Sequence, residues 1–157
     1  MSADELRAVM RRFPTGVAVV TVDVNGQQLG LTVSVLVSLS LEPPLVGVAI
    51  RRDAALHELL REASAFGVSI LADGQEALAR HFARGVPPIA LWQGVEREPG
   101  PLTGAPLLAG AAGWLEARLT AEHAVGDHTL FVGELLAAAS SVTAGPLVHI
   151  DGGFRPL

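Results

Sequence analysis

The fold class is decided by the stretch VAVVTVDVNGQQLGLTVS, which occupies residues 17–34. Residues 17–22 are almost entirely apolar and rich in β-branched side chains, a composition that favours a strand. The pair Asn25-Gly26 follows, and it is preferred in type I′ turns because both central residues of such a turn need a positive φ. We therefore expect a β-hairpin whose return strand runs from about Gln28 to Ser34.

Five later segments also have the composition of strands. The clearest is residues 115–122, where four apolar residues alternate with polar ones, so we expect the apolar four to face the core. These four are Leu115, Ala117, Leu119 and Ala121. The other segments are residues 45–50, 66–71, 129–136 and 147–150.

Three short helices are expected between the strands. In the first, apolar residues recur at helical spacing within residues 6–13, and Ser2 and Glu5 have the spacing of a capping box. A helix this short is marginal alone, so its apolar face is expected to dock on another surface. Asp53 and Asp73 are expected to cap the second and third helices.

Most of these strands are joined by hairpins, and regular alternation of strands and helices is absent. The pattern predicts a mainly β fold, an antiparallel barrel with a few short helices. The length of 157 residues fits one core, so we expect a single domain over residues 1–157. The proline- and glycine-rich residues 84–107 are expected to form a loop with at most one helical turn.

Composition excludes several classes of protein. Half of the residues are hydrophobic and 17% are charged, which is too apolar for a disordered chain. The apolar runs stop short of the roughly 20 residues that a membrane-spanning helix needs, so we expect no membrane partner. A net charge of −5 argues against a nucleic-acid partner. The acidic start, residues 1–5, lacks the basic flank of a secretory signal, so we expect a cytoplasmic protein.

Several catalytic motifs are missing. There is no Gly-x-Gly-x-x-Gly, no P-loop and no Gly-x-Ser-x-Gly. The absence of lysine excludes Schiff-base chemistry, and the absence of cysteine excludes disulfides and thiolate ligands. The five histidines form no His-x-x-x-His or His-x-His pair, so we expect no metal site.

The most unusual stretch is residues 30–44, GLTVSVLVSLSLEPP. Its hydroxyl groups lie at alternating positions, broken at Leu36, within an otherwise aliphatic segment. A strand would send the hydroxyls to one side and the valines to the other, which suits a flat ligand with a polar edge. The alternative is a sheet with one face in water. The hydroxyl residues are Thr32, Ser34, Ser38 and Ser40.

Two further motifs carry charge. Arg51-Arg52-Asp53 lies between a predicted strand and a helix N-terminus, where guanidinium groups and unpaired amides form an anion site; two solvated arginines and a helix cap are the alternative. Gly126-Asp127-His128 lies at a turn before an apolar strand, where a histidine can serve as a donor or an acid, or can be merely structural. His123 is near enough in sequence to be a rival.

Taken in order, these segments resemble the flavin reductase-like family, whose fold is an FMN-binding split barrel. The resemblance covers nearly the whole chain, and the ordered spacing of its motifs makes it specific. The motifs are FPTGVAVVT at residues 13–21, GLTVS at 30–34 with Ser38, Ser40 and Pro43-Pro44, FGVSIL at 66–71, GDH at 126–128, VGE at 132–134 and PLV at 146–148.

The resemblance implies an NAD(P)H-dependent flavin reductase, a homodimer in which hydride passes from NADH or NADPH to flavin N5. FMN is the expected flavin, with FAD as the alternative, and reduced flavin would go to a separate monooxygenase. Because the cofactor supplies the electron chemistry, the protein need only hold two rings in register.

The resemblance also assigns roles to residues. The isoalloxazine ring would be lined, largely by backbone groups, by Thr32, Val33, Ser34, Val35 and Leu36, with Ser38 and Ser40 near the ribityl chain. The phosphate would be bound by Arg51, Arg52 and Asp53, with Arg84 as a weaker candidate. His128 would lie near the nicotinamide.

Two other functions are compatible with the residues. A protein with the same fold could retain FMN as an electron carrier or sensor, without turnover of free flavin, because retention is a question of affinity. A non-catalytic dimeric barrel without cofactor would use the hydroxyl row only as the wet face of a sheet. Flavin absorbance in the purified protein would exclude this last alternative.

Overall fold

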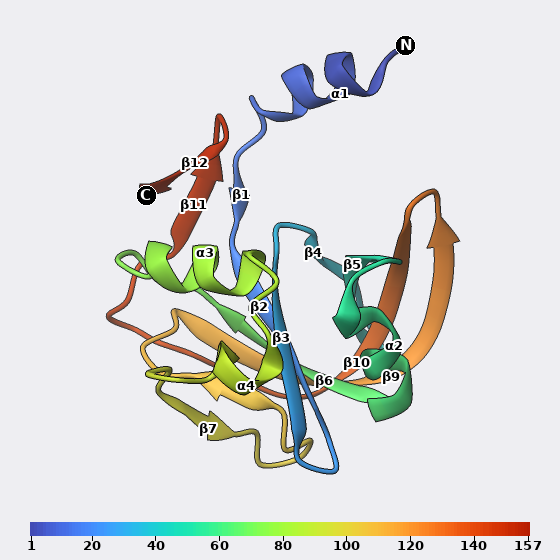
Figure 1. Cartoon of the computed structure of the whole chain (residues 1–157), viewed down its shortest axis with the longest axis vertical. Helices are drawn as coiled ribbons and strands as arrows, with labels where there is room; N and C mark the ends of the chain where they lie inside the picture. Colours follow the sequence, from blue (N-terminus) through green and yellow to red (C-terminus); the bar gives the residue numbers. More distant parts are fainter.

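The computed structural model describes residues 1–157 and is built mainly from antiparallel β-strands (Figure 1). Seven strands form the central sheet in the order β3-β2-β6-β9-β10-β5-β4, and all neighbours are antiparallel. Their bounds are β2 Ala18–Val24, β3 Gln27–Val33, β4 Leu36–Leu41, β5 Pro44–Arg51, β6 Ala65–Ile70, β9 Gly113–Val125 and β10 His128–Ser140. The expected mainly β, antiparallel fold is confirmed.

The hairpin predicted from residues 17–34 forms as strands β2 and β3. Asn25 and Gly26 have φ values of 52° and 88°, as the type I′ turn requires. Strand β2 pairs with β3 on one side and β6 on the other, and its valines are buried on both faces: Val19, Val20 and Val22 are fully covered. The hairpin therefore supplies much of the hydrophobic core.

The two edge strands of the sheet, β3 and β4, are consecutive in the chain. Only Ser34 and Val35 separate them, so the sheet must curl until its edges approach at this point, which is the geometry of a split barrel. The hydroxyl row at residues 32–40 does not lie on a single strand, since β3 ends at Val33 and β4 begins at Leu36. The row breaks at Ser34 and Val35, and its two halves lie on opposite edges of the sheet.

Helices α2 (Ala55–Ala63), α3 (Glu76–Ala83) and α4 (Pro88–Leu91) pack against the sheet. α2 buries Leu56, His57, Leu59 and Leu60. The expected aspartate caps are wrong: the N-cap residues are Ala54 for α2 and Gln75 for α3, and neither side chain caps its helix. Asp53 binds Arg51 instead, because a guanidinium ion attracts a carboxylate more strongly than backbone amides do.

Helix α1 (Ala3–Met10) has the predicted capping box between Ser2 and Glu5 but no buried residue. It projects away from the sheet at the N-terminal end of the chain (Figure 1). The expectation that its apolar face docks is not met within this chain, because Leu6, Val9 and Met10 are all at least half exposed.

The remaining strands form two small sheets. β1 (Thr15–Gly16), β11 (Leu147–Ile150) and β12 (Gly153–Pro156) pair beside the barrel. β7 (Arg97–Pro99) and β8 (Pro106–Leu108) form a short hairpin within the segment that we expected to be loop. The predicted helical turn in that segment is present as α4. None of the helices is both long and apolar enough to cross a membrane.

Strand β9 departs from its simple alternation at Glu116. We expected this residue to face solvent, but it is fully buried and its carboxylate accepts hydrogen bonds from the backbone N–H groups of Leu102 and Thr103. The Thr103 hydroxyl donates to the same oxygen over 2.7 Å. The carboxylate therefore anchors the loop between β7 and β8, which local patterning cannot reveal.

Candidate functional site

A cavity of about 280 Å³ lies beside the break between β3 and β4. Six of the predicted site residues line it, although they come from three separate parts of the chain: Thr32, Val33, Ser34, Val35, Arg51 and His128. The four other lining residues are apolar: Leu31, Ala49, Ala54 and Ala83. The cavity thus has an apolar wall and a charged end.

The apolar wall includes exposed backbone. Ser34 and Val35 lie outside the strand ladders, and their N–H groups have no backbone partner. The Val35 carbonyl accepts a hydrogen bond from Ala49 N–H over 3.4 Å, which ties the break to β5. Two free amide donors at the edge of an aliphatic surface suit the polar edge of a planar ring.

A second cavity of about 540 Å³ shares Ser34 and Val35 with the first. It is lined on one side by Met10 and Phe13 from the N-terminal segment and on the other by Leu36 and Val37 from β4. Ligand cavities usually have volumes of about 300–1,000 Å³. The second cavity lies within this range and the first lies just below it, so the break between β3 and β4 has a hollow on each side.

Arg51 and His128 form the charged end and are held side by side, because they are paired residues in the β5–β10 ladder. The Arg51 guanidinium donates two hydrogen bonds to Asp53, over 3.0 and 2.9 Å. These bonds and the positive charge of Arg51 hold the pKa of Asp53 below its usual range. The same bonds and the negative charge of Asp53 raise the pKa of Arg51. Arg51 is thus a fixed cation whose charge is partly offset by Asp53.

His128 is oriented by the turn that precedes it. Gly126 takes a φ of 58°, and the Asp127 carboxylate lies 2.7 Å from Nδ1 of His128. The hydrogen bond from His128 lowers the pKa of Asp127, so the carboxylate is ionised and can only accept. Nδ1 therefore carries a proton, and Nε2 is left without a partner in the chain, free to meet a ligand.

The N-terminus of α2 opens beside this charged end. Ala54 lines the cavity and is the N-cap residue, but its side chain cannot bond the first-turn amides. The Arg52 N–H donates to the Asp127 carbonyl over 3.0 Å, so the segment before α2 is fastened to the turn that carries His128. Free helix amides beside Arg51 form an environment that favours an anionic group.

The structure leaves other predicted residues outside the 280 Å³ cavity. Leu36 lines the second cavity but not the first, and Arg52, Asp53 and Arg84 are exposed and do not line the first. Ser38 and Ser40 lie further along β4 and line neither cavity. The roles proposed for these residues stay predictions.

Sequence reasoning missed the small apolar residues of the wall. Ala49 and Arg51 alternate on one face of β5, so the strand period alone could have paired them. Ala54 and Ala83 carry no chemical signal, and they line the cavity because α2 and α3 bring them there. Small side chains at these places leave room for a ligand.

The Thr32 hydroxyl has a role that the sequence did not indicate. It donates a hydrogen bond to the Ala79 carbonyl over 2.6 Å, which ties β3 to α3. The hydroxyl is therefore occupied, and only the remainder of Thr32 contributes to the cavity wall. The backbone N–H groups of Ser34 and Val35 are therefore the main polar groups on the apolar wall of the cavity.

This split barrel has the features of a protein that binds a flavin nucleotide. Its cavity has an apolar wall with free amides at the strand break, and an arginine and a histidine lie at the other end. The residues fit such a group: the amides suit a ring edge, the aliphatic wall suits a ring face, and Arg51 with the helix amides suits a phosphate.

Comparison with known proteins identifies the protein family. The model of the flavin reductase like domain family matches residues 10–157. An NADH-dependent FAD reductase of Streptomyces globisporus is 40% identical over 153 residues, which cover 96% of this chain and 84% of the relative. The reductase component of 4-hydroxyphenylacetate 3-monooxygenase from Thermus thermophilus is 36% identical over 154 residues, which cover 98% and 96%.

A solved structure agrees with these relatives. The Streptomyces globisporus NADH:FAD oxidoreductase in complex with NAD and FAD fragments superposes with a TM-score of 0.92 at 39% identity, covering 97% of this chain and 90% of the other. The chain belongs to the flavin reductase like domain family. The family resemblance and the split-barrel fold expected from the sequence are thereby confirmed.

Proposed function

We propose that this protein is an NADH-dependent flavin reductase that binds a flavin and a nicotinamide nucleotide at the cavity beside Ser34 and Val35. One observation carries the proposal: three segments far apart in sequence bring free backbone amides, Arg51 and His128 to one hollow. The activities named for the Streptomyces and Thermus relatives support it.

The residues of the cavity would have distinct tasks. The amides of Ser34 and Val35 would bond the polar edge of the flavin ring, while Val33 and Ala49 would exclude water from its face. Arg51 would hold the flavin phosphate. Nε2 of His128 would orient the nicotinamide, since Nδ1 is committed to Asp127. The bound flavin would supply the hydride-accepting ring, so the protein needs no acid or base of its own.

The test is anaerobic mixing of the purified protein with FMN and NADH, followed by the loss of flavin absorbance near 450 nm. NADPH, FAD and riboflavin in parallel mixtures would give the preferences for donor and flavin. We expect bleaching at a rate proportional to protein concentration. No acceleration over the mixture without protein would contradict the proposal.

We also propose that reduced flavin leaves the protein for a separate monooxygenase in the cytoplasm. The support is the Thermus relative, which is named as the reductase component of a monooxygenase. After anaerobic reduction, ultrafiltration should pass most of the flavin through the membrane. Flavin retained with the protein would favour the alternative, an FMN-retaining carrier or sensor.

A homodimer is the form that we propose for the active protein. Strand β4 is a sheet edge that carries three exposed aliphatic residues at alternate positions, Val37, Leu39 and Leu41, and Val35 just before the strand is exposed as well. The uncovered apolar side chains of α1 lie across the 540 Å³ cavity from this strand. Apolar patches of this extent are rarely left in water, so a second copy would cover both.

Sedimentation equilibrium would test the dimer. The variant with Val37→Asp and Leu39→Asp should sediment as a monomer because a partner would bury these side chains. The control is Ile89→Asp, at a residue that is 89% exposed on α4, away from the patch. A monomeric wild type, or a double variant that stays dimeric, would contradict this proposal.

A further inference from the structure

One polar side chain is buried in the apolar face of α2. His57 is only 6% exposed, and its neighbours on the buried face are Leu56, Leu59 and Leu60. Its ring packs edge-on against Phe131, with 5.1 Å between the ring centres. A buried imidazole is costly unless its nitrogens are bonded, so this residue needs a physical explanation.

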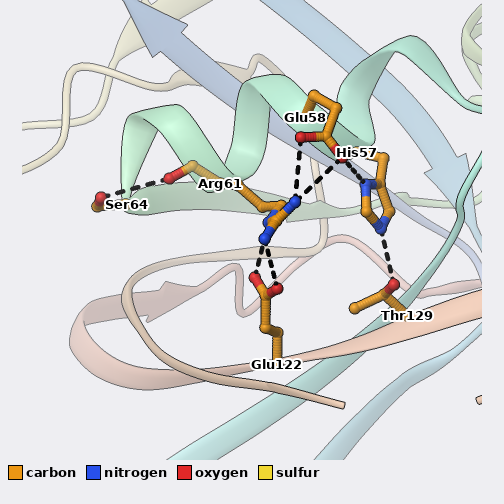
Figure 2. A network of polar contacts seen from close by, with 6 residues as sticks. All are labelled: His57, Glu58, Arg61, Ser64, Glu122 and Thr129. Carbon is orange, nitrogen blue, oxygen red and sulfur yellow. Dashed lines mark hydrogen bonds and ion pairs between the residues drawn. The ribbon is translucent and has the colours of Figure 1, made fainter. Parts of the chain in front are cut away.

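Both ring nitrogens of His57 have partners (Figure 2). Nδ1 lies 2.8 Å from Oε1 of Glu58, and Nε2 lies 2.7 Å from Oγ1 of Thr129. The bond to His57 holds the pKa of Glu58 below its usual range, so this carboxylate is ionised and accepts the Nδ1 proton. Nε2 shares a hydrogen bond with the hydroxyl of Thr129, which is itself only 6% exposed.

The bond between His57 and Thr129 joins the two segments that carry the charged end of the cavity. Thr129 follows His128 on β10 and pairs with Ile50, which precedes Arg51 on β5. His57 lies in the first turn of α2, the helix that begins directly after Asp53 and Ala54. The bond therefore fixes the start of α2 against the start of β10, from the core side of the cavity.

The polar network continues from His57 to the surface. Arg61 binds Glu58 and also Glu122 of β9, where Nη2 lies 3.0 Å from Oε1 (Figure 2). Arg61 is 48% and Glu58 71% exposed, so these ion pairs are screened by solvent and contribute little. The bond between His57 and Thr129 is the buried part of the network, where water cannot replace either partner.

We propose that His57 is a positioning residue for flavin reduction: through Thr129 it sets the spacing between the Arg51–Ala54 segment and His128. It touches neither substrate and acts through the backbone of both segments. This inference rests on the proposed flavin reductase function. It adds a residue, buried behind the cavity, to those that line it.

The experiment compares His57→Leu, which removes both bonds, with His57→Gln, which keeps a polar group able to reach Thr129. FMN and riboflavin affinities are measured by quenching of flavin fluorescence, and kcat and KM for NADH by anaerobic turnover. We expect His57→Leu to weaken FMN binding about tenfold, the size of the loss when a charged hydrogen bond to the phosphate is misaligned. Riboflavin binding should change less than twofold, because riboflavin has no phosphate to place.

Three further variants separate positioning from mere stability. Thr129→Val should reproduce the loss of FMN binding, Thr129→Ser should restore it, and Glu122→Gln, which alters only the exposed ion pair, should behave as wild type. Because valine has nearly the size and shape of threonine, Thr129→Val keeps the test valid if His57→Leu does not fold. Adding Thr129→Val to His57→Leu should cause no further loss, since both remove the same bond.

The outcomes are distinct. Equal losses for FMN and riboflavin, or a lower unfolding temperature with unchanged FMN binding, would make His57 merely structural and overturn the inference. A wild-type protein that neither binds nor reduces flavin would overturn the proposed function, and the inference with it. The inference alone would be overturned if the wild type turns over flavin and His57→Leu and Thr129→Val have the same ratio of FMN to riboflavin affinity as the wild type.

Discussion

The two ends of the cavity are built from different parts of the chain. At the strand break, the polar groups are backbone amides of Ser34 and Val35, which the curl of the sheet leaves without partners. At the other end, the polar groups are the side chains of Arg51 and His128, each bonded to a neighbouring aspartate. Side-chain substitutions should therefore alter the charged end strongly and the strand break weakly.

The largest effect is expected for Arg51→Ala. Loss of a charged hydrogen bond to the flavin phosphate should weaken FMN binding about tenfold while leaving riboflavin binding nearly unchanged. Isothermal titration with both flavins measures the difference. The matched control is Arg52→Ala, because Arg52 is exposed and does not line the cavity. Equal losses for the two arginines would remove the distinction between them.

His128→Ala should act on turnover instead of flavin binding. Without Nε2 to orient the nicotinamide, reduction by NADH should slow about tenfold, while FMN affinity stays near that of wild type. Anaerobic stopped-flow absorbance measures this rate. His123→Ala is the control, since His123 is exposed on β9 and lines neither cavity. A similar slowing in both variants would assign no special role to His128.

The sequence predicted the local features of this molecule well. The β2–β3 hairpin depends on Asn25-Gly26, and the capping box of α1 depends on Ser2 and Glu5, so a few neighbouring residues decide each of them. Arg51 and His128 were identified because their motifs carry charge next to a turn. The ladder that pairs them depends on the whole sheet and could not be deduced from either motif.

What the sequence did not predict depends on distant contacts. The hydroxyl row breaks at Ser34 and Val35 because β3 and β4 must reach opposite edges of the curled sheet. Glu116 is buried because a loop from residues 100–105 places its amides there. In both cases a partner far away in sequence outweighs the local pattern. Asp53 is the exception, because it fails to cap α2 in favour of a close neighbour, Arg51.

Thr32→Val tests the end of the cavity at the strand break, where we expect side chains to matter little for flavin binding. Because the Thr32 hydroxyl is bonded to the Ala79 carbonyl, its loss should lower the free energy of unfolding by about 1 kcal/mol. FMN affinity should change less than twofold, since the backbone amides of the break are untouched. Chemical denaturation and fluorescence quenching measure the two quantities. A marked loss of FMN affinity at unchanged stability would contradict this and would indicate that the hydroxyl binds the flavin ring.

The smallest effect is expected for Asp53→Asn, and it has the opposite sign. Asp53 competes with a flavin phosphate for Arg51, so its neutralisation should strengthen FMN binding about two- to threefold, the modest gain typical of an exposed ion pair. Riboflavin binding should not respond. Titration of both flavins at pH 7 measures the difference, and unchanged FMN affinity would mean that the Arg51–Asp53 pair does not compete with the ligand.

Lowering the pH should not reproduce this gain. Arg51 depresses the pKa of Asp53 below its ordinary value of 3.8, so the carboxylate is ionised throughout the neutral and mildly acidic range. The ion pair is present above that ordinary value and is lost only as the pH falls through the lowered pKa. The wild type and Asp53→Asn should therefore differ in FMN affinity by the same factor at pH 7 and at pH 5. A difference that vanishes at pH 5 would show that Asp53 is protonated there and that Arg51 does not hold it.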